Sequence, residues 1–178
     1  LRGGGTVKAV THDFVCWADP PHKEEAGTPN LMGVVALSTA RDILNSIGMA
    51  NIEAYERELT RYAINKMASI PNIKIYGDIE NIDNRVGIIS FNIKDLPHGL
   101  IASALAYESA ISVRSGCFCA HPYIQKLLGL SSEEIKKQIR TSKSPYAGMV
   151  RVSFGLYNTK EEVDIFLSGL KRIVAMFS

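Results

Sequence analysis

From residue 49 onward, stretches of helical periodicity alternate with short stretches of strand periodicity, and this order limits the folds open to the chain. Apolar residues recur at steps of three and four in 52–69 and again from Thr159 onward. The clearest strand, 86–93, alternates between two faces. The whole order, α-β-β-α-β-α-α-β-α, predicts an α/β unit: a mixed or antiparallel sheet of about four strands, covered mainly on one side by helices.

Turn residues and capping signals place the individual elements of this unit. Two Ser/Thr-x-x-Glu sequences, at 131–134 and 159–162, are capping boxes that begin helices. We expect strands at 73–76, 86–93, 111–113 and 150–157, and helices at 52–69, 97–108, 122–128, 131–140 and from 159 onward. The last helix should bury a stripe made of Val163, Phe166, Leu170, Ile173 and Phe177.

The first 48 residues have a different character. Residues 6–11 alternate weakly, as a strand does, and 19–30 is a loop rich in proline and glycine. A helix at 29–48 has apolar residues on more than one side, so we expect it to be largely buried. We therefore expect a boundary near Gly48, with 1–48 and 49–178 as separate parts.

The composition is that of an ordinary globular protein. Of 178 residues, 46% are hydrophobic and 21% charged, which excludes disordered, collagen-like and coiled-coil chains. The net charge of +2 does not indicate the strongly basic surface that nucleic-acid binding requires. No apolar run approaches the ~18 residues of a membrane span. We expect a soluble, cytoplasmic chain with no nucleic-acid and no membrane partner. Because it begins at Leu1 without an initiator methionine, we expect its start to lie inside a longer protein.

The densest group of reactive residues is the run RSGCFCAHP at 114–122. The three cysteines of the chain (Cys16, Cys117 and Cys119) are odd in number and suit free thiols in a reducing compartment. A thiol at this loop–helix junction near arginine side chains could have a lowered pKa and act as a nucleophile, or it could be a small buried hydrophobe. Cys117, Cys119 and His121 could also bind a metal, but no second pair stands at ligand spacing, so we expect none.

Two further places could bind an anion. Arg151 stands on the polar side of a strand whose other side is apolar, where a guanidinium could clamp a carboxylate or pair with a helix carboxylate. Gly27 and Thr28 precede a helix, where backbone N–H groups and a hydroxyl could face a phosphate. The same residues could equally be an N-cap with a proline-initiated first turn.

In combination these stretches resemble the class V (fold-type I) pyridoxal-phosphate enzymes, and within them the cysteine desulfurases and selenocysteine lyases. The resemblance spans nearly the whole chain, in the family's order. It rests on four stretches: GGG at 3–5, EAGTPN at 25–30, RSGxxCAxP at 114–122, and RVSxxxYNTxEE at 151–162.

The resemblance implies a role for each matching residue. Arg151 matches the arginine that grips the substrate's carboxylate, and Arg114 an active-site arginine beside the nucleophile. Cys119 matches the nucleophile that takes the substrate's sulfur as a persulfide and leaves alanine. Thr28, with Gly27, matches the loop that contacts the cofactor phosphate of the neighbouring subunit in a homodimer. By the same resemblance, 49–178 is the family's two-layer α+β small domain and 1–48 a remnant of its large cofactor-binding domain.

The chain also departs from the family's pattern. The desulfurases most like it carry two histidines where Cys117 and Phe118 stand, and the interval from Cys119 to Arg151 is longer than usual, with an added helical segment at 131–140. Aminotransferase or other class V lyase activity therefore stays open.

No lysine stands in the context of the family's cofactor lysine, since Lys8 follows the glycines and Lys23 lies in the proline-rich loop. The resemblance thus implies pyridoxal 5'-phosphate, a cysteine or selenocysteine substrate and a sulfur-acceptor protein for a longer parent. We expect this chain alone to be inactive and not to retain the cofactor. The alternatives are a non-enzymatic thiol or metal-binding module at Cys117, Cys119 and His121, and a dimerisation fragment whose helix at 29–48 is exposed.

Overall fold

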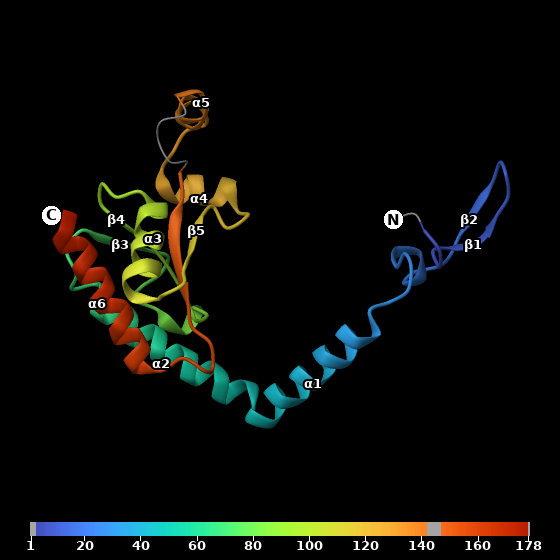
Figure 1. Cartoon of the computed structure of the whole chain (residues 1–178), viewed down its shortest axis with the longest axis horizontal. Coiled ribbons are helices and arrows are strands. Elements are labelled where there is room, and N and C mark those ends of the chain that lie inside the picture. The colour runs from blue at the N-terminus through green and yellow to red at the C-terminus, as the bar shows by residue number, and fades with distance from the viewer. Residues whose placement is uncertain (1–2, 142–146, 178) are drawn as a thin grey trace. The chain divides into compact units, whose positions relative to one another are not determined.

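The computed structural model describes residues 3–141 and 147–177, in two compact units, Leu1–Met49 and Ala50–Ser178. Each unit is described by itself. The first contains the strands β1 (Val7–Val10) and β2 (Val15–Trp17), a single turn of 3-10 helix at His22–Glu24, and the helix α1 (Leu31–Ile47) (Figure 1). No described helix is both long enough and apolar enough to pass through a membrane.

In the first unit, β1 and β2 form an antiparallel hairpin, with Val7 opposite Trp17 and Val10 opposite Val15. The sequence predicted the first strand but not the second, which has only three residues and little alternation to signal it. A backbone hydrogen bond from the Thr11 N–H to the Phe14 carbonyl closes the turn between them. The hairpin therefore depends on its turn more than on a hydrophobic pattern.

The helix α1 begins where the sequence predicted, but it is not buried. The Asn30 side chain caps it by accepting a hydrogen bond from the Gly33 N–H at 2.9 Å, and Gly48 ends it at a φ of +92°. None of its residues is buried, and apolar side chains such as Leu37 are exposed. The expectation of a largely buried helix is wrong for this structure, because no other described element of the first unit covers its apolar sides.

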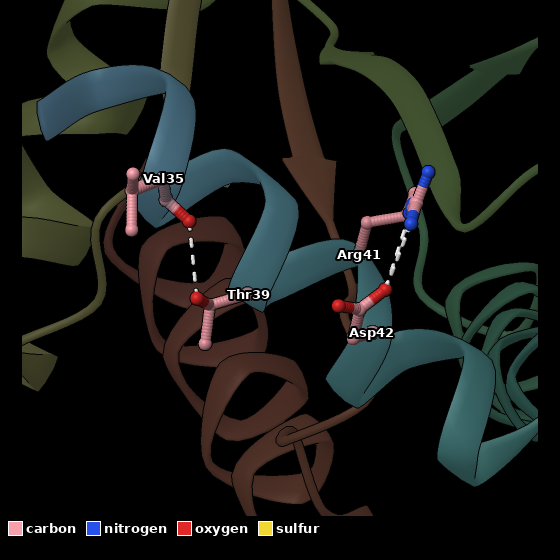
Figure 2. A network of polar contacts seen from close by, with 4 residues as sticks. All are labelled: Val35, Thr39, Arg41 and Asp42. Carbon is pink, nitrogen blue, oxygen red and sulfur yellow. Dashed lines mark hydrogen bonds and ion pairs between the residues drawn. The ribbon is translucent and has the colours of Figure 1, made fainter. Parts of the chain in front are cut away.

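Figure 2 shows the polar contacts along α1, and they are local to the helix. The Thr39 hydroxyl donates to the Val35 carbonyl one turn earlier at 3.0 Å, and Arg41 pairs with its neighbour Asp42 at 3.0 Å (Figure 2). Such contacts satisfy single groups without fixing a tertiary neighbour. They do not compensate for the exposed apolar surface of α1.

The second unit contains the expected four-stranded sheet with helices. Its strand order is β3-β4-β6-β5, and every neighbouring pair is antiparallel. The strands are β3 (Ile73–Tyr76), β4 (Ile88–Ile93), β5 (Arg114–Gly116) and β6 (Met149–Ser153). The helices are α2 (Met49–Met67), α3 (His98–Ser109), α4 (His121–Leu128), α5 (Ser132–Thr141) and α6 (Lys160–Phe177), with a 3-10 turn at Ile82–Asn84.

One face of the sheet carries the core. The alternation in β4 and β6 points Ile89, Phe91, Val150 and Val152 to the side where α2, α3 and α6 pack. The Phe91 and Phe166 rings meet edge to face, with centroids 6.0 Å apart. The helices contribute chiefly the buried side chains of Leu59, Ala63, Met67, Ile101, Leu105, Val163, Leu167, Leu170 and Ile173.

The predicted burial of the apolar stripe of the last helix is confirmed except at its last residue. Val163, Phe166 and Leu170 are buried, whereas Phe177 is 54% exposed. Phe177 lies in the final turn of α6, where periodicity continues but the described core does not.

Three of the four predicted strands differ at their ends. The strand predicted at 86–93 begins only at Ile88. The strand predicted at 111–113 is irregular, because the Ile111 N–H donates to the Leu105 carbonyl and closes the end of α3, with Ala110 in the left-handed region. Pairing with β6 begins only at Arg114. The strand predicted at 150–157 ends at Ser153, since the following residues form a turn before α6.

Capping and side-chain contacts join α6 to α2. Both predicted capping boxes are confirmed: the Thr159 N–H donates to the Glu162 carboxylate at 3.1 Å, and the Ser131 N–H to that of Glu134 at 2.8 Å. The Tyr62 hydroxyl donates to Asp164 at 2.6 Å. The box at 159–162 fixes the start of α6, and the Tyr62 contact ties α6 to α2. The box at 131–134 fixes the start of α5.

Phe91 offers a direct test of this core. Phe91→Ala should lower the free energy of unfolding by about 3–5 kcal/mol, because it opens a cavity at a fully buried site. Urea denaturation of the full chain measures this. Tyr107→Ala is the matched control, since that ring is 91% exposed on α3 and should cost well under about 1 kcal/mol. Equal losses in both variants would contradict the assignment of the core.

Candidate functional site

The face of the sheet opposite the core carries a row of polar side chains. In register across the four strands stand Tyr76, Ser90, Arg151 and Arg114, each directly opposite the next. Arg151 lies on this face because its neighbours in β6 point to the core. The two arginines that the sequence singled out at 114 and 151 are therefore cross-strand partners.

The surroundings of Arg151 suit an anionic ligand. Directly opposed residues have Cβ atoms about 4.5–5.5 Å apart, so two positively charged side chains leave the sheet from neighbouring positions. Among the described residues, neither Arg151 nor Arg114 makes an ion pair, so the alternative of a helix carboxylate gains no support. The Arg151 Nε is buried and makes no hydrogen bond to a described group. An anion between the two side chains would relieve their repulsion.

The turn after β5 presents Cys119 in a strained backbone. Gly116 has a φ of +115°, and Phe118 and Cys119 have φ values of +52° and +58°. Two consecutive non-glycine residues in the left-handed region are unusual, and such strain collects at functional sites. The Ala120 N–H donates to the Cys117 carbonyl at 2.7 Å and closes the turn just before α4. The side chain of Cys119 is exposed.

Cys117 differs from Cys119 in both contact and exposure. Its thiol is partly buried and donates to the Ala147 carbonyl at 2.9 Å. Burial raises the pKa of the Cys117 thiol, opposite to the lowered pKa expected of an activated thiol in this run. Cys117 therefore fits the buried-hydrophobe interpretation and ties the turn to the residues that precede β6.

Three residues near this turn were missed from the sequence. A Cβ added at Gly148 would lie 2.6 Å from His98 Nε2 and 2.8 Å from the Gly116 Cα, so only glycine allows this approach. The Asn92 amide donates to the Gly148 carbonyl at 3.1 Å. For Asn92 the sequence did offer one signal, a polar residue at an alternating position of a strand. The contacts of His98 and Gly148 are tertiary, and the sequence pattern does not show them.

The metal-binding alternative gains no support. In the described part of the chain, no three or more His, Cys, Asp or Glu side chains are grouped so as to hold a metal ion. The Cys117 thiol donates instead to a carbonyl, and this leaves only Cys119 and His121 of the hypothesised set.

In the first unit, the glycine turn and the Gly-Thr-Pro loop contact each other. The Gly27 N–H donates to the Gly4 carbonyl at 2.8 Å, and a Cβ added at Gly3 would lie 3.1 Å from the Ala26 Cβ. The Gly27 N–H is thus occupied rather than turned to an anion, which corrects one detail of the sequence interpretation. Gly27 instead adopts a positive φ of +82°, a backbone conformation that favours glycine. Thr28 is exposed, shortly before the N-terminus of α1.

Iodoacetamide labelling at pH 8 should separate the two neighbouring thiols. Cys119 should react faster than Cys117, on the order of tenfold, because Cys119 is exposed while Cys117 is partly buried with a raised pKa. Both lie in the tryptic peptide 115–126, so fragment-ion mass spectrometry locates the label. In urea the two rates should converge. Equal rates in the native chain would contradict this geometry.

Comparison with known proteins finds similarity over nearly the whole chain. The family model of aminotransferase class-V matches residues 1–166. A probable cysteine desulfurase from Synechocystis sp. is 34% identical over 176 residues, and one from Staphylococcus aureus (strain COL) is 38% identical over 177 residues; each match covers 99% of this chain and 38% of the relative.

Solved structures give the same result. The cysteine desulfurase from Thermococcus onnurineus NA1 is similar with a TM-score of 0.77 and 32% identity, over 98% of this chain and 39% of that one. The cysteine desulfurase CsdA from Escherichia coli is similar with a TM-score of 0.77 and 28% identity, over 99% of this chain and 38% of that one. The chain thus spans about two-fifths of the length of these relatives, and it belongs to the aminotransferase class-V family.

Proposed function

We propose that this chain supplies the substrate-binding and sulfur-accepting residues of a pyridoxal-phosphate-dependent cysteine desulfurase, with selenocysteine as the alternative substrate. The observation that carries the proposal is the cross-strand pair Arg114–Arg151 next to the strained turn that presents Cys119. Since the chain spans 38% of its curated relatives, the complete activity would be that of a longer protein.

Arg151 would bind the substrate's carboxylate. A guanidinium can donate two parallel N–H bonds to a carboxylate, and such charge-assisted pairs both bind and orient. Its buried Nε is a donor without a described partner, and leaving a buried donor unpaired costs free energy that a ligand would recover. Arg114, directly opposite, adds a second positive charge.

Cys119 would take the sulfur atom. Its thiolate attacks the sulfur of the bound substrate, an S–S bond forms, and the substrate's Cβ–S bond breaks. The electron pair of that bond stays with Cβ, which gains a proton to become the methyl group of alanine. Cys119 then carries a persulfide, which a sulfur-acceptor protein would remove. The exposed position of Cys119 suits such a transfer.

The cofactor of this family is pyridoxal phosphate, which supplies an electron sink for bond cleavage next to the amino group. The residues of the first unit fit its phosphate: the exposed Thr28 hydroxyl stands shortly before the N-terminus of α1, where anions are favoured. Gly27 would hold the loop's conformation through its bond to Gly4. We propose that 1–48 belongs to the large cofactor-binding domain and 49–178 to the small domain.

The same proposal includes a cytoplasmic homodimer in which Thr28 serves the neighbouring subunit. The exposed apolar side chains of α1 are consistent with a surface that is covered in such an assembly.

Activity of the longer protein tests the roles of Cys119 and Arg151. Cys119→Ser should lower alanine formation from cysteine by about 10³-fold or more, because the nucleophile is lost. Arg151→Lys should raise KM about 10- to 100-fold, because the bidentate contact is lost. Cys16→Ser, in the first unit, is the control and should leave turnover unchanged. Normal turnover in Cys119→Ser would overturn the desulfurase proposal.

The chain by itself should not retain the cofactor. After incubation with pyridoxal phosphate and exhaustive dialysis, we expect no absorbance band of a covalently held cofactor, because no lysine stands in the family's context. Lys8→Ala and Lys23→Ala variants serve as comparison. A band that survives dialysis and vanishes in one of them would show that this chain holds its own cofactor lysine.

A further inference from the structure

We propose that Phe118 is a positioning residue that fixes the plane of the Arg151 guanidinium for carboxylate binding. The inference rests on the proposed role of Arg151 and deepens it. Phe118 immediately precedes Cys119 in the turn after β5. Its ring contacts Arg151.

The contact is a cation–π interaction. The guanidinium carbon of Arg151 lies 5.3 Å from the centroid of the Phe118 ring, within the ~6 Å over which such attraction is significant. A ring against one face of a guanidinium leaves the N–H groups at its edge able to donate. The ring therefore restricts the orientation of Arg151 without consuming its donors.

The backbone holds the ring in place. Phe118 has a φ of +52°, a conformation that phenylalanine adopts only where its surroundings enforce it. The Ala120 N–H closes the turn at 2.7 Å on the Cys117 carbonyl, and the Cys117 thiol donates to the Ala147 carbonyl at 2.9 Å. Two hydrogen bonds thus fix the turn on either side of the ring.

Electrostatics gives the ring a second effect. Arg151 stands directly opposite Arg114, and like charges at paired positions repel. The negative face of an aromatic ring attracts the guanidinium and so offsets part of that repulsion. Because a phenyl ring neither titrates nor exchanges a proton, Phe118 does this without adding a third positive charge.

The side-chain Nε–H signal of Arg151 in the ¹⁵N-labelled full chain reports on the contact directly. Arg151→Lys assigns the signal by removing it. In Phe118→Leu the signal should move toward that of a solvent-exposed arginine, because the ring no longer shields it, whereas Phe118→Tyr should keep it in place. Tyr123→Leu, which removes an exposed ring on α4, is the control and should leave it unchanged. An unchanged Arg151 signal in Phe118→Leu would overturn the proposal.

Titration with L-alanine, an unreactive amino-acid carboxylate, measures the consequence for binding. The Kd for L-alanine, read from the Arg151 signal, should be about three- to tenfold higher in Phe118→Leu than in the native chain. In Phe118→Tyr it should stay within about twofold of the native value. Equal affinity in the native chain and Phe118→Leu would overturn the positioning role and leave the carboxylate role of Arg151 standing. A native Arg151 signal that does not respond to L-alanine would contradict both the carboxylate role and the positioning proposal built on it.

Discussion

The pairing of β6 between β4 and β5 is the interaction on which the rest of the second unit depends. This one strand sends Val150 and Val152 into the core and Arg151 to the opposite face. A shift of register by one residue would exchange these faces and bury the guanidinium. The hydrophobic core therefore sets the position of the candidate binding residue as well as stabilising the fold.

The same strand pairing creates local conflicts that the core must offset. It brings Arg114 opposite Arg151, and it ends in a turn whose Phe118 and Cys119 lie in the left-handed region. Residues held in such conformations cost of order 1–3 kcal/mol each. A sheet face with no ligand to bind would gain nothing from either feature. Both features lie within residues 114–119 and the paired strand β6, and this nearness supports the proposal that this face binds an anion.

Much of this arrangement could be predicted from the sequence, because it depends on local patterns. Strand alternation placed Arg151 opposite the core, and two capping boxes began α5 and α6 where predicted. The errors lie at the ends of elements and in one helix. Phe177 continues a helical period beyond the described core, and Ile111 caps α3 instead of pairing. The expected burial of α1 was wrong, because apolar residues on several sides of a helix favour burial but do not show that another element covers them.

The periodicity of the sequence does not predict the contacts that matter most for the chemistry. The thiol of Cys117 and the ring of Phe118 have unlike roles: one ties the turn to the Ala147 carbonyl, and the other stacks on Arg151. Neither group transfers protons near neutral pH, so this loop positions its neighbours by packing rather than by acid–base chemistry. An imidazole from another element also lies near this loop, because His98 Nε2 on α3 and the Gly116 Cα both lie close to Gly148.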